Sequence, residues 1–235
     1  TFSGNVAEVV SGGGMYNRNS SPTVANTILW GNTAPVDQGP DIYQDAGTLT
    51  LNHCVVRKYD TANNPTVTSN DCIITDPLLT SQDVRGDPPA TSADVYIYVL
   101  GPLSPARDAG LAVGTPISGD VKVPDVDQRG YFRPKNVNTD IGSWQHGATQ
   151  PVTITTSAGP NGSFSPTSKT VPSGDTVTFV VSADAGYVIE SLTDNGASVA
   201  VPAGTKRYEH TISNVSAAHK LEARFAVRDY KVTVI

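Results

Sequence analysis

Glycine, proline and β-branched residues interrupt every stretch of this chain in which a long amphipathic helix could form. The 235 residues include 21 Gly and 17 Pro, and short apolar runs end repeatedly at Asn, Gly, Asp or Pro. Such runs are typical of short strands joined by tight turns. The sequence therefore predicts an all-β fold, with enough chain for one large domain or two ordinary ones.

Charge is sparse: Asp, Glu, Lys and Arg make up 16% of the residues, against about 25% in an average globular protein. The net charge is −6, and no run of Lys or Arg could follow a phosphate backbone, so we expect no nucleic-acid partner. No stretch approaches the roughly 20 apolar residues that span a bilayer, so we expect no membrane insertion. The chain lacks an initiator Met and a signal-like start, which indicates a fragment.

Residues 1–148 repeat a short pattern in which Asn precedes an apolar or β-branched run. Asn26-Thr27-Ile28-Leu29 aligns with Asn52-His53-Cys54-Val55 at a shift of 26, and Asn70-Asp71-Cys72-Ile73 follows after about 18–20 more residues. A loose period of this size, with one strand at the equivalent place, predicts a solenoid in which Asn side chains stack between repeats. An ordinary β-sandwich is the alternative.

Five pieces of this first part occur in an order that is similar to a known family: "GGGMYNRNSSPTVANTILWGN", "DCIITDPLL", "GPLSPARDAG", "DQRGYFRP" and "TDIGSWQ". On these motifs residues 1–147 resemble the C-terminal end of secreted bacterial right-handed parallel β-helix proteins, which have a pectin lyase-like fold. The final part resembles a choice-of-anchor Q domain. The resemblance implies β-helix coils closed by a cap over 1–148. Gln145 departs from the pattern, because the family carries Glu there, so a charge pair is not carried over to this position.

The second part alternates apolar and polar residues between turns such as "GPNG", "PSGD" and "DNG". Residues 149–228, with "VPSGDTVTF" and "ADAGYVIESLTDNG", resemble the divergent InlB B-repeat, a small β-grasp-like module of bacterial surface proteins. Residues 229–235, "DYKVTVI", match the opening "PVTITTS" of that module. We therefore expect them to be the first strand of a further, truncated repeat.

The charged stretch "DVDQRGYFRPKNVNTDIGSWQHG", residues 125–147, has three interpretations. Asp125, Asp127 and Asp140 are weak candidates for Ca²⁺ ligands, because the later ligands of a calcium loop are missing. A catalytic carboxylate pair is a poorer fit. We favour a structural cap over the unpaired edge of the last coil, in which Arg129 or Arg133 pairs bidentately with an Asp. The predicted cap residues are Asp108, Asp127, Arg129, Arg133, Asp140 and Trp144.

No stretch of the sequence predicts a catalytic site. Ser104 and Asp108 lack a His at a spacing that completes a triad. The nearest approach to the cation and carboxylate cluster of a β-helix polysaccharide lyase is Arg57-Lys58 followed by Asp60, which a solvated turn explains. We therefore expect no catalytic residues and no cofactor in this chain, Ca²⁺ excepted.

Two further residue groups bear on function. The sequence separation of Cys54 and Cys72 is compatible either with a disulfide between neighbouring strands or with two buried free thiols. Tyr16, Trp30 and Tyr43 are candidates for a surface that stacks on sugar rings.

These patterns and resemblances lead to one leading functional hypothesis. The chain would be a non-catalytic part of an extracellular or cell-surface bacterial protein, acting as a stalk, adhesion or attachment module within a longer multi-repeat chain. Its partner would be a polysaccharide or a cell-surface or matrix component. The alternative is the non-catalytic C-terminal part of a polysaccharide lyase or glycoside hydrolase whose active site lies in upstream coils. A purely mechanical spacer is a third option.

Overall fold

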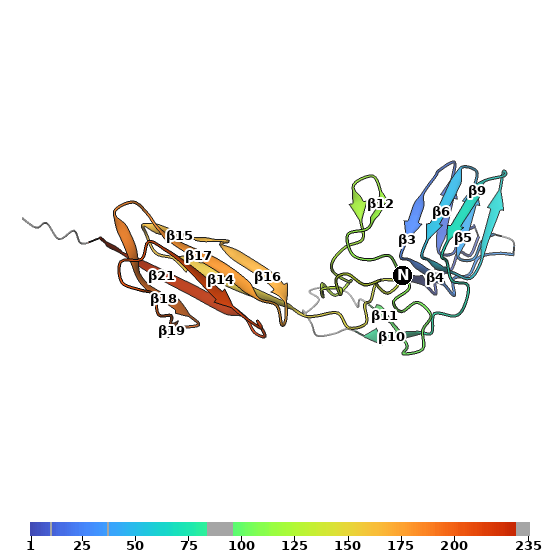
Figure 1. Cartoon of the computed structure of the whole chain (residues 1–235). Coiled ribbons are helices and arrows are strands. Elements are labelled where there is room, and N and C mark those ends of the chain that lie inside the picture. The colour runs from blue at the N-terminus through green and yellow to red at the C-terminus, as the bar shows by residue number, and fades with distance from the viewer. Residues whose placement is uncertain (10, 37, 84–95, 229–235) are drawn as a thin grey trace, which may run out of the picture. The chain divides into compact units, whose positions relative to one another are not determined.

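The computed structural model describes residues 1–9, 11–36, 38–83 and 96–228 (Figure 1). The chain divides into two compact units, Thr1–Ala148 and Thr149–Ile235, called unit 1 and unit 2 below. Every regular element among the described residues is a β-strand, so the predicted all-β fold is confirmed. None of these residues forms a helix with the length and apolar character that crossing a membrane requires. The strand predicted at 229–235 lies outside the described residues.

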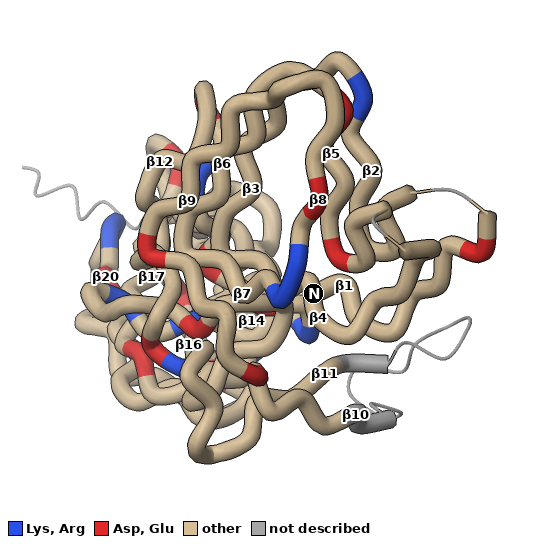
Figure 2. The backbone as a smooth tube through the Cα atoms, turned by 90° about the vertical axis from the view of Figure 1, so that its right-hand side faces the viewer, with Lys and Arg blue, Asp and Glu red and all other residues tan. Residues whose placement is uncertain are grey.

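Unit 1 begins with nine short strands in three parallel sheets, each sheet taking every third strand (Figures 1 and 2). The chain therefore passes through the same three sheets three times. The sheets are β1 (Phe2–Ser3), β4 (Ile28–Trp30) and β7 (Val55–Val56); β2 (Met15–Arg18), β5 (Ile42–Asp45) and β8 (Tyr59–Ala62); and β3 (Thr23–Ala25), β6 (Thr48–Asn52) and β9 (Thr66–Asn70).

The register between strands fixes the length of each pass. Ile28 lies beside Val55, and Val55 lies beside Ile73. The shift in residue number is thus 27 from the first pass to the second. From the second pass to the third it is 18 between β6 and β9 and between Val55 and Ile73, and 17 between β5 and β8. The first of these shifts exceeds by one the shift of 26 that the sequence suggests, so that alignment is wrong by one. A slip of one residue matters in a strand, because it moves every side chain to the opposite face.

The predicted Asn stack survives this correction in part. Asn52 lies beside Asn70, and the Asn70 amide nitrogen donates to the Asn52 side-chain oxygen at 2.7 Å. In the first pass the position beside Asn52 belongs to Ala25. Asn26 is instead at a corner, where it is equivalent to His53.

A left-handed residue makes the same corner in each pass. Asn26, His53 and Asp71 have φ values of 47°, 48° and 50° and follow the strands β3, β6 and β9. Asn, Asp and His are the non-glycine residues that enter this region most readily. The recurrence of the same backbone conformation at equivalent places explains how three passes of different sequence keep one shape.

The interior enclosed by the three sheets is apolar except for Gln44, which is fully buried. Alternation along the strands points one set of side chains inward, as along β6, where Leu49 and Leu51 are buried. The buried residues of this core are Val24, Leu29, Ile42, Leu49, Leu51, Cys54 and Val56.

A second core lies on the outer face of β4 and β7. Ile28 and Val55 point away from the interior and pack with Leu100, Ala106 and Ile141. The described residues after β9 in unit 1 form two antiparallel pairs, and their remaining chain is irregular. The pairs are β10 (Leu79–Asp83) with β11 (Tyr96–Leu100), and β12 (Pro116–Ser118) with β13 (Val121–Lys122).

The described residues of unit 2 form two sheets with one core between them. The strand order is β16-β14-β21-β18-β19 in the first sheet and β15-β17-β20 in the second. All pairings are antiparallel except β14 with β21. Phe164, Phe179 and Leu221 are among the buried core residues. The strands are β14 (Pro151–Ala158), β15 (Gly162–Ser165), β16 (Ser168–Pro172), β17 (Val177–Ala183), β18 (Tyr187–Asp194), β19 (Ala197–Ser198), β20 (Arg207–Ile212) and β21 (His219–Val227).

Because the two units have separate cores, we expect a core substitution to destabilise only the unit that carries it. Phe179→Ala removes a fully buried ring from unit 2 and should lower its unfolding free energy by about 3–5 kcal/mol. Both tryptophans, Trp30 and Trp144, lie in unit 1. The thermal transition seen by tryptophan fluorescence should therefore not move in this variant, while part of the far-UV circular dichroism change shifts to lower temperature.

Leu49→Ala is the matched control, because Leu49 is fully buried in unit 1. This variant should shift the fluorescence transition. A Phe179→Ala protein whose fluorescence transition moved as far as that of Leu49→Ala would show that the units unfold together.

Candidate functional site

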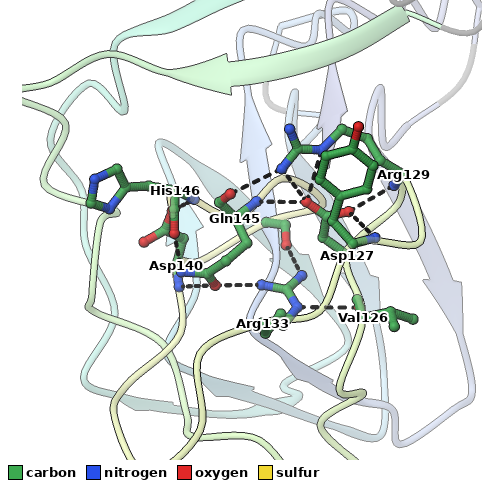
Figure 3. Close-up of polar contacts among 9 residues, drawn as sticks. Val126, Asp127, Arg129, Arg133, Asp140, Gln145 and His146 are labelled. Carbon is green, nitrogen blue, oxygen red and sulfur yellow. Dashed lines mark hydrogen bonds and ion pairs between the residues drawn. The ribbon is translucent and has the colours of Figure 1, made fainter. Parts of the chain in front are cut away.

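Arg129 and Asp127 form an ion pair in the predicted cap (Figure 3). Arg129 Nε and Nη2 donate to the same carboxylate oxygen, Oδ2, at 2.9 and 2.5 Å. The backbone amides of Arg129 and Tyr131 donate to the other oxygen at 2.8 and 3.2 Å. The guanidinium also lies over the rings of Tyr131 and Trp144, at 4.6 and 5.2 Å from their centroids. The fully buried carboxylate thus organises a turn that otherwise has a single antiparallel bridge, between Val126 and Phe132.

Gln145 joins this ion pair to the rest of the segment (Figure 3). Its Oε1 accepts from Arg133 Nη1 and from the Asp140 backbone amide, both at 2.9 Å. Its Nε2 donates to the carbonyl of His146 at 3.0 Å, and its own carbonyl accepts from Arg129 Nη2 at 3.0 Å. The amide therefore supplies both an acceptor for a cation and a donor for a carbonyl, which a carboxylate could not do.

Arg133 is held by neutral acceptors. Besides Gln145, it donates to the carbonyls of Gly142 at 3.1 Å and Val126 at 3.3 Å. Burial lowers the pKa of the Arg133 guanidinium below its ordinary value, while the nearby carboxylates of Asp127 and Asp140 oppose that shift. The sequence predicts a bidentate Arg–Asp pair, and the structure puts the ion pair at Arg129 and gives Arg133 carbonyl and amide partners.

Asp140 is completely buried, and its carboxylate accepts from the backbone amides of Asp108 and His146. Among the described residues, one set of His, Cys, Asp or Glu side chains has three ligand atoms within 4.8 Å of one another, and it consists of Asp108, Asp140 and His146. The predicted Ca²⁺ set is therefore not brought together. Asp125 is exposed, and the Asp127 carboxylate is engaged by Arg129.

The segment lies along the side of the stacked strands. Gly142 N donates to the Asn26 carbonyl at 2.9 Å, and Ser143 N donates to Thr1 Oγ1 at 3.2 Å. Upstream of the segment, a His53 ring nitrogen is hydrogen-bonded to the Ala109 carbonyl at 2.9 Å. These contacts involve the corner residues of the first and second passes, Asn26 and His53, and the start of the chain. The predicted position over the last coil is therefore not where these residues lie. The outer face of β4 and β7 is apolar, and Ile141 and Trp144 of the segment supply part of its cover.

The residues that came nearest to a catalytic pattern have structural partners. The Ser104 hydroxyl donates to the Pro77 carbonyl at 2.6 Å and accepts from the Ala106 amide at 3.2 Å. Arg57 is 3.4 Å from the buried carboxylate of Asp41. Neither side chain is arranged as a free nucleophile or base.

Tyr16 and Tyr43 form a stacked pair on the outer face of β2 and β5. They are in register, with ring centroids 5.8 Å apart and planes inclined by 15°. Along β5, Ile42 and Gln44 are buried in the interior, so Tyr43 points outward. Tyr16 is 49% exposed. This pair, called the tyrosine surface below, presents an aromatic face to solvent at the place where two passes meet.

Trp30 does not belong to the tyrosine surface. It lies on β4, in a different sheet, and packs against the core that contains Ile28 and Ile141. Of the three residues proposed for sugar stacking, the structure brings two together and separates the third.

Charged residues beside the tyrosine surface are paired. Arg18 Nε lies 3.6 Å from Asp45 across β2 and β5. Lys58 lies 3.4 Å from Asp60, which is in register with Tyr43. Figure 2 shows these charges around β2, β5 and β8, whereas β3, β6 and β9 carry none. The surface therefore combines an apolar ring face with locally balanced charge.

Unit 2 has a hollow of about 740 Å³ over the outer faces of β14, β18 and β21. Its lining includes Ser157, Glu190, Thr193, Glu222 and Arg224, and no aromatic side chain. It lacks the ring face that sugar stacking needs. The tyrosine surface is therefore the better candidate for that role.

Cys54 and Cys72 are free thiols in the structure, and the Cys54 amide donates to Cys72 Sγ at 3.4 Å. Cys54 is completely buried and Cys72 is half-buried. Their separation of 18 residues did not decide between a disulfide and free thiols in the sequence. In the structure it equals the shift from the second pass to the third at this corner.

Two polar clusters were not predicted from the sequence. In unit 1, the buried Asp41 accepts from the backbone amide of Asn32 at 3.2 Å and from its side-chain nitrogen at 3.0 Å. In unit 2, a ring nitrogen of His219 is 2.7 Å from Asp194, and His210 lies 3.5 Å from the same carboxylate. Asn32 and Asp41 are 9 residues apart and belong to no strand, and His219 is 25 residues from Asp194, so no strand or motif spacing could have revealed these clusters.

Comparison with known families identifies part of the chain. Residues 152–228 match the family model described as the divergent InlB B-repeat domain, which confirms the resemblance stated for that part. No curated protein and no solved structure matches the chain. The resemblance of residues 1–147 stays a prediction.

Gln145→Ala tests the structural role of this segment. The variant leaves the buried Arg133 and the Asp140 amide without their shared acceptor, so we expect a loss of about 1.5–3 kcal/mol in the unfolding free energy of unit 1. Denaturant unfolding followed by tryptophan fluorescence measures this loss. Gln128→Ala is the matched control, because Gln128 is exposed and its backbone amide keeps the bond to Ser143. Equal stability of the two variants would contradict the assignment.

Proposed function

We propose that residues 1–148 are the C-terminal coils and cap of a right-handed parallel β-helix. We further propose that the chain is a non-catalytic attachment module of an extracellular bacterial surface protein and binds a neutral glycan on its tyrosine surface. The observation that carries the glycan part is the stacked, solvent-facing pair of Tyr16 and Tyr43.

Three parallel sheets support the β-helix. Each takes every third strand, successive passes are in register, and the same left-handed corner recurs. These are the properties of coils stacked in a solenoid.

Surface localisation is supported by unit 2. InlB B-repeat domains are typically found in bacterial surface proteins, and residues 152–228 match that domain. Such a module extends a chain from one element to the next, which is consistent with attachment as its role.

The absence of catalysis from this chain is supported by the structural use of its candidate groups. Ser104 is bonded to backbone on both sides, and Arg57 is engaged by the buried Asp41. An activity of the whole protein would then belong to other parts of it.

A neutral glycan is favoured by the chemistry around the tyrosines. Sugar rings present C–H groups that pack on aromatic faces, and a tyrosine hydroxyl adds a hydrogen-bonding group. Arg18 is paired with Asp45 and Lys58 with Asp60. On the described part of this sheet face, neither cation is left to neutralise a uronate, so ring stacking dominates over charge.

Tyr16→Ala and Tyr43→Ala test this proposal. Isothermal titration with a soluble β-glucan should show saturable binding by the unaltered chain, and each variant should weaken it about tenfold, equal to about 1.4 kcal/mol. Polygalacturonate should bind more weakly than the neutral polymer.

Tyr59→Ala is the control, because Tyr59 is an exposed tyrosine of β8 in register with Ile42 and not with the tyrosine pair. It should leave affinity unchanged. Absence of saturable binding to either polymer would leave a mechanical spacer as the better description, and binding unaffected by both tyrosine variants would move the site elsewhere.

A further inference from the structure

Cys54 and Cys72 occupy equivalent places in successive passes. Their neighbours Val55 and Ile73 form a parallel bridge, and Asn52 and Asn70 are in register two residues earlier. Neighbouring strands lie about 4.7–4.9 Å apart, which falls within the Cα separation of about 4.4–6.8 Å found in disulfides. A covalent link between these two residues therefore needs little movement of the backbone.

The two thiols differ in how they can be reached. Cys54 is completely buried between passes, where its Sγ is 3.4 Å from the Val24 carbonyl. Cys72 belongs to the third pass and is half-buried at the edge of the same core. A small reagent can therefore contact Cys72 before it contacts Cys54.

The two thiols also differ in acidity. A hydrogen bond from the Cys54 side chain, followed by one from Ser69 and one from the Cys54 amide, lowers the pKa of Cys72 to about 6 against burial. Its charge is also favoured by His53. The same hydrogen bond together with burial raises the pKa of Cys54. The accessible thiol is thus the more acidic of the two, and its nucleophilic thiolate form is reached at a lower pH than that of the buried thiol.

We propose that Cys72 and Cys54 are a thiol–disulfide exchange site, in which Cys72 attacks a small disulfide and Cys54 resolves the adduct into a bond between the second and third passes. This inference does not depend on glycan binding.

The exchange takes place in two steps. Cys72 Sγ attacks one sulfur of a disulfide RSSR, the S–S bond breaks, and RS⁻ leaves, so that Cys72 carries –SR. Cys54 then gives its proton to the released thiolate, and its sulfur attacks Cys72 Sγ and displaces the second RS⁻, which takes a proton from water or buffer. The two cysteines lose two electrons, and RSSR is reduced to two RSH.

The linked form would tie the third pass to the second. The bond would lie in the core of unit 1, beside the Asn52–Asn70 contact, and would close a loop the length of one pass. The last pass would then resist local opening, because it could no longer separate from the pass that it packs against.

Glutathione disulfide and the full chain test the proposal. Intact-mass analysis of the unaltered protein should show loss of two hydrogens, and peptide mapping should find the Cys54–Cys72 bond. Cys54→Ser should stop at a glutathione adduct on Cys72. Cys72→Ser should react at least about tenfold more slowly, because its remaining thiol is buried and protonated.

Alkylation of Cys72 by iodoacetamide in the unaltered protein gives a second measurement that needs no variant. Its rate should be half-maximal near pH 6, and in Cys54→Ala the midpoint should move toward the ordinary thiol value of 9.0. A stable glutathione adduct on the unaltered protein, equal reactivity of the two single-serine variants, or a midpoint near the ordinary value in the unaltered protein would each overturn the proposal.

Discussion

Hydrogen bonding between successive passes of the chain is the constraint on which the rest of unit 1 depends. Because the strands are parallel and in register, each residue lies beside its equivalent one pass later. Side chains that are far apart in sequence therefore meet in columns. The aromatic surface, the amide contact and the thiol pair all follow from this single arrangement. The columns are Tyr16–Tyr43, Asn52–Asn70 and Cys54–Cys72.

The stacked strands also explain why residues 125–147 are rich in charged and polar side chains. Strands satisfy their backbone groups in ladders, but the irregular chain that covers β4 and β7 has few ladder partners. Its amides must find other acceptors when they are buried. Asp127, Asp140 and Gln145 supply those acceptors, each to two or more donors. Polar side chains in this segment therefore replace secondary structure, which a scan for catalytic patterns would misinterpret.

Composition and turn residues are enough to predict an all-β chain, because Gly, Pro and β-branched residues determine the local backbone conformation. The predicted shift between the first two passes is one residue too short. The sequence pattern aligns Asn26 with Asn52, but Asn26 is a corner residue and Ala25 is the residue that lies beside Asn52. The separation of Trp30 from the tyrosines could not be foreseen, because it depends on which sheet each run joins. The sequence distinguishes Gln145 only as a departure from a family pattern. Its hydrogen-bond partners could not be predicted, because tertiary structure sets them.

The pairing of the first and last strands among the described residues of unit 2 has a mechanical consequence. β14 and β21 lie side by side and run parallel over five residue pairs, from Ile154 with His219 to Ala158 with Ala223. Tension applied to the start of β14 and the end of β21 would pull them in opposite directions along their length. All the hydrogen bonds between them would then bear the load together in shear, where an antiparallel pair would unzip one bond at a time. A domain with this arrangement is suited to transmit force along a chain without opening.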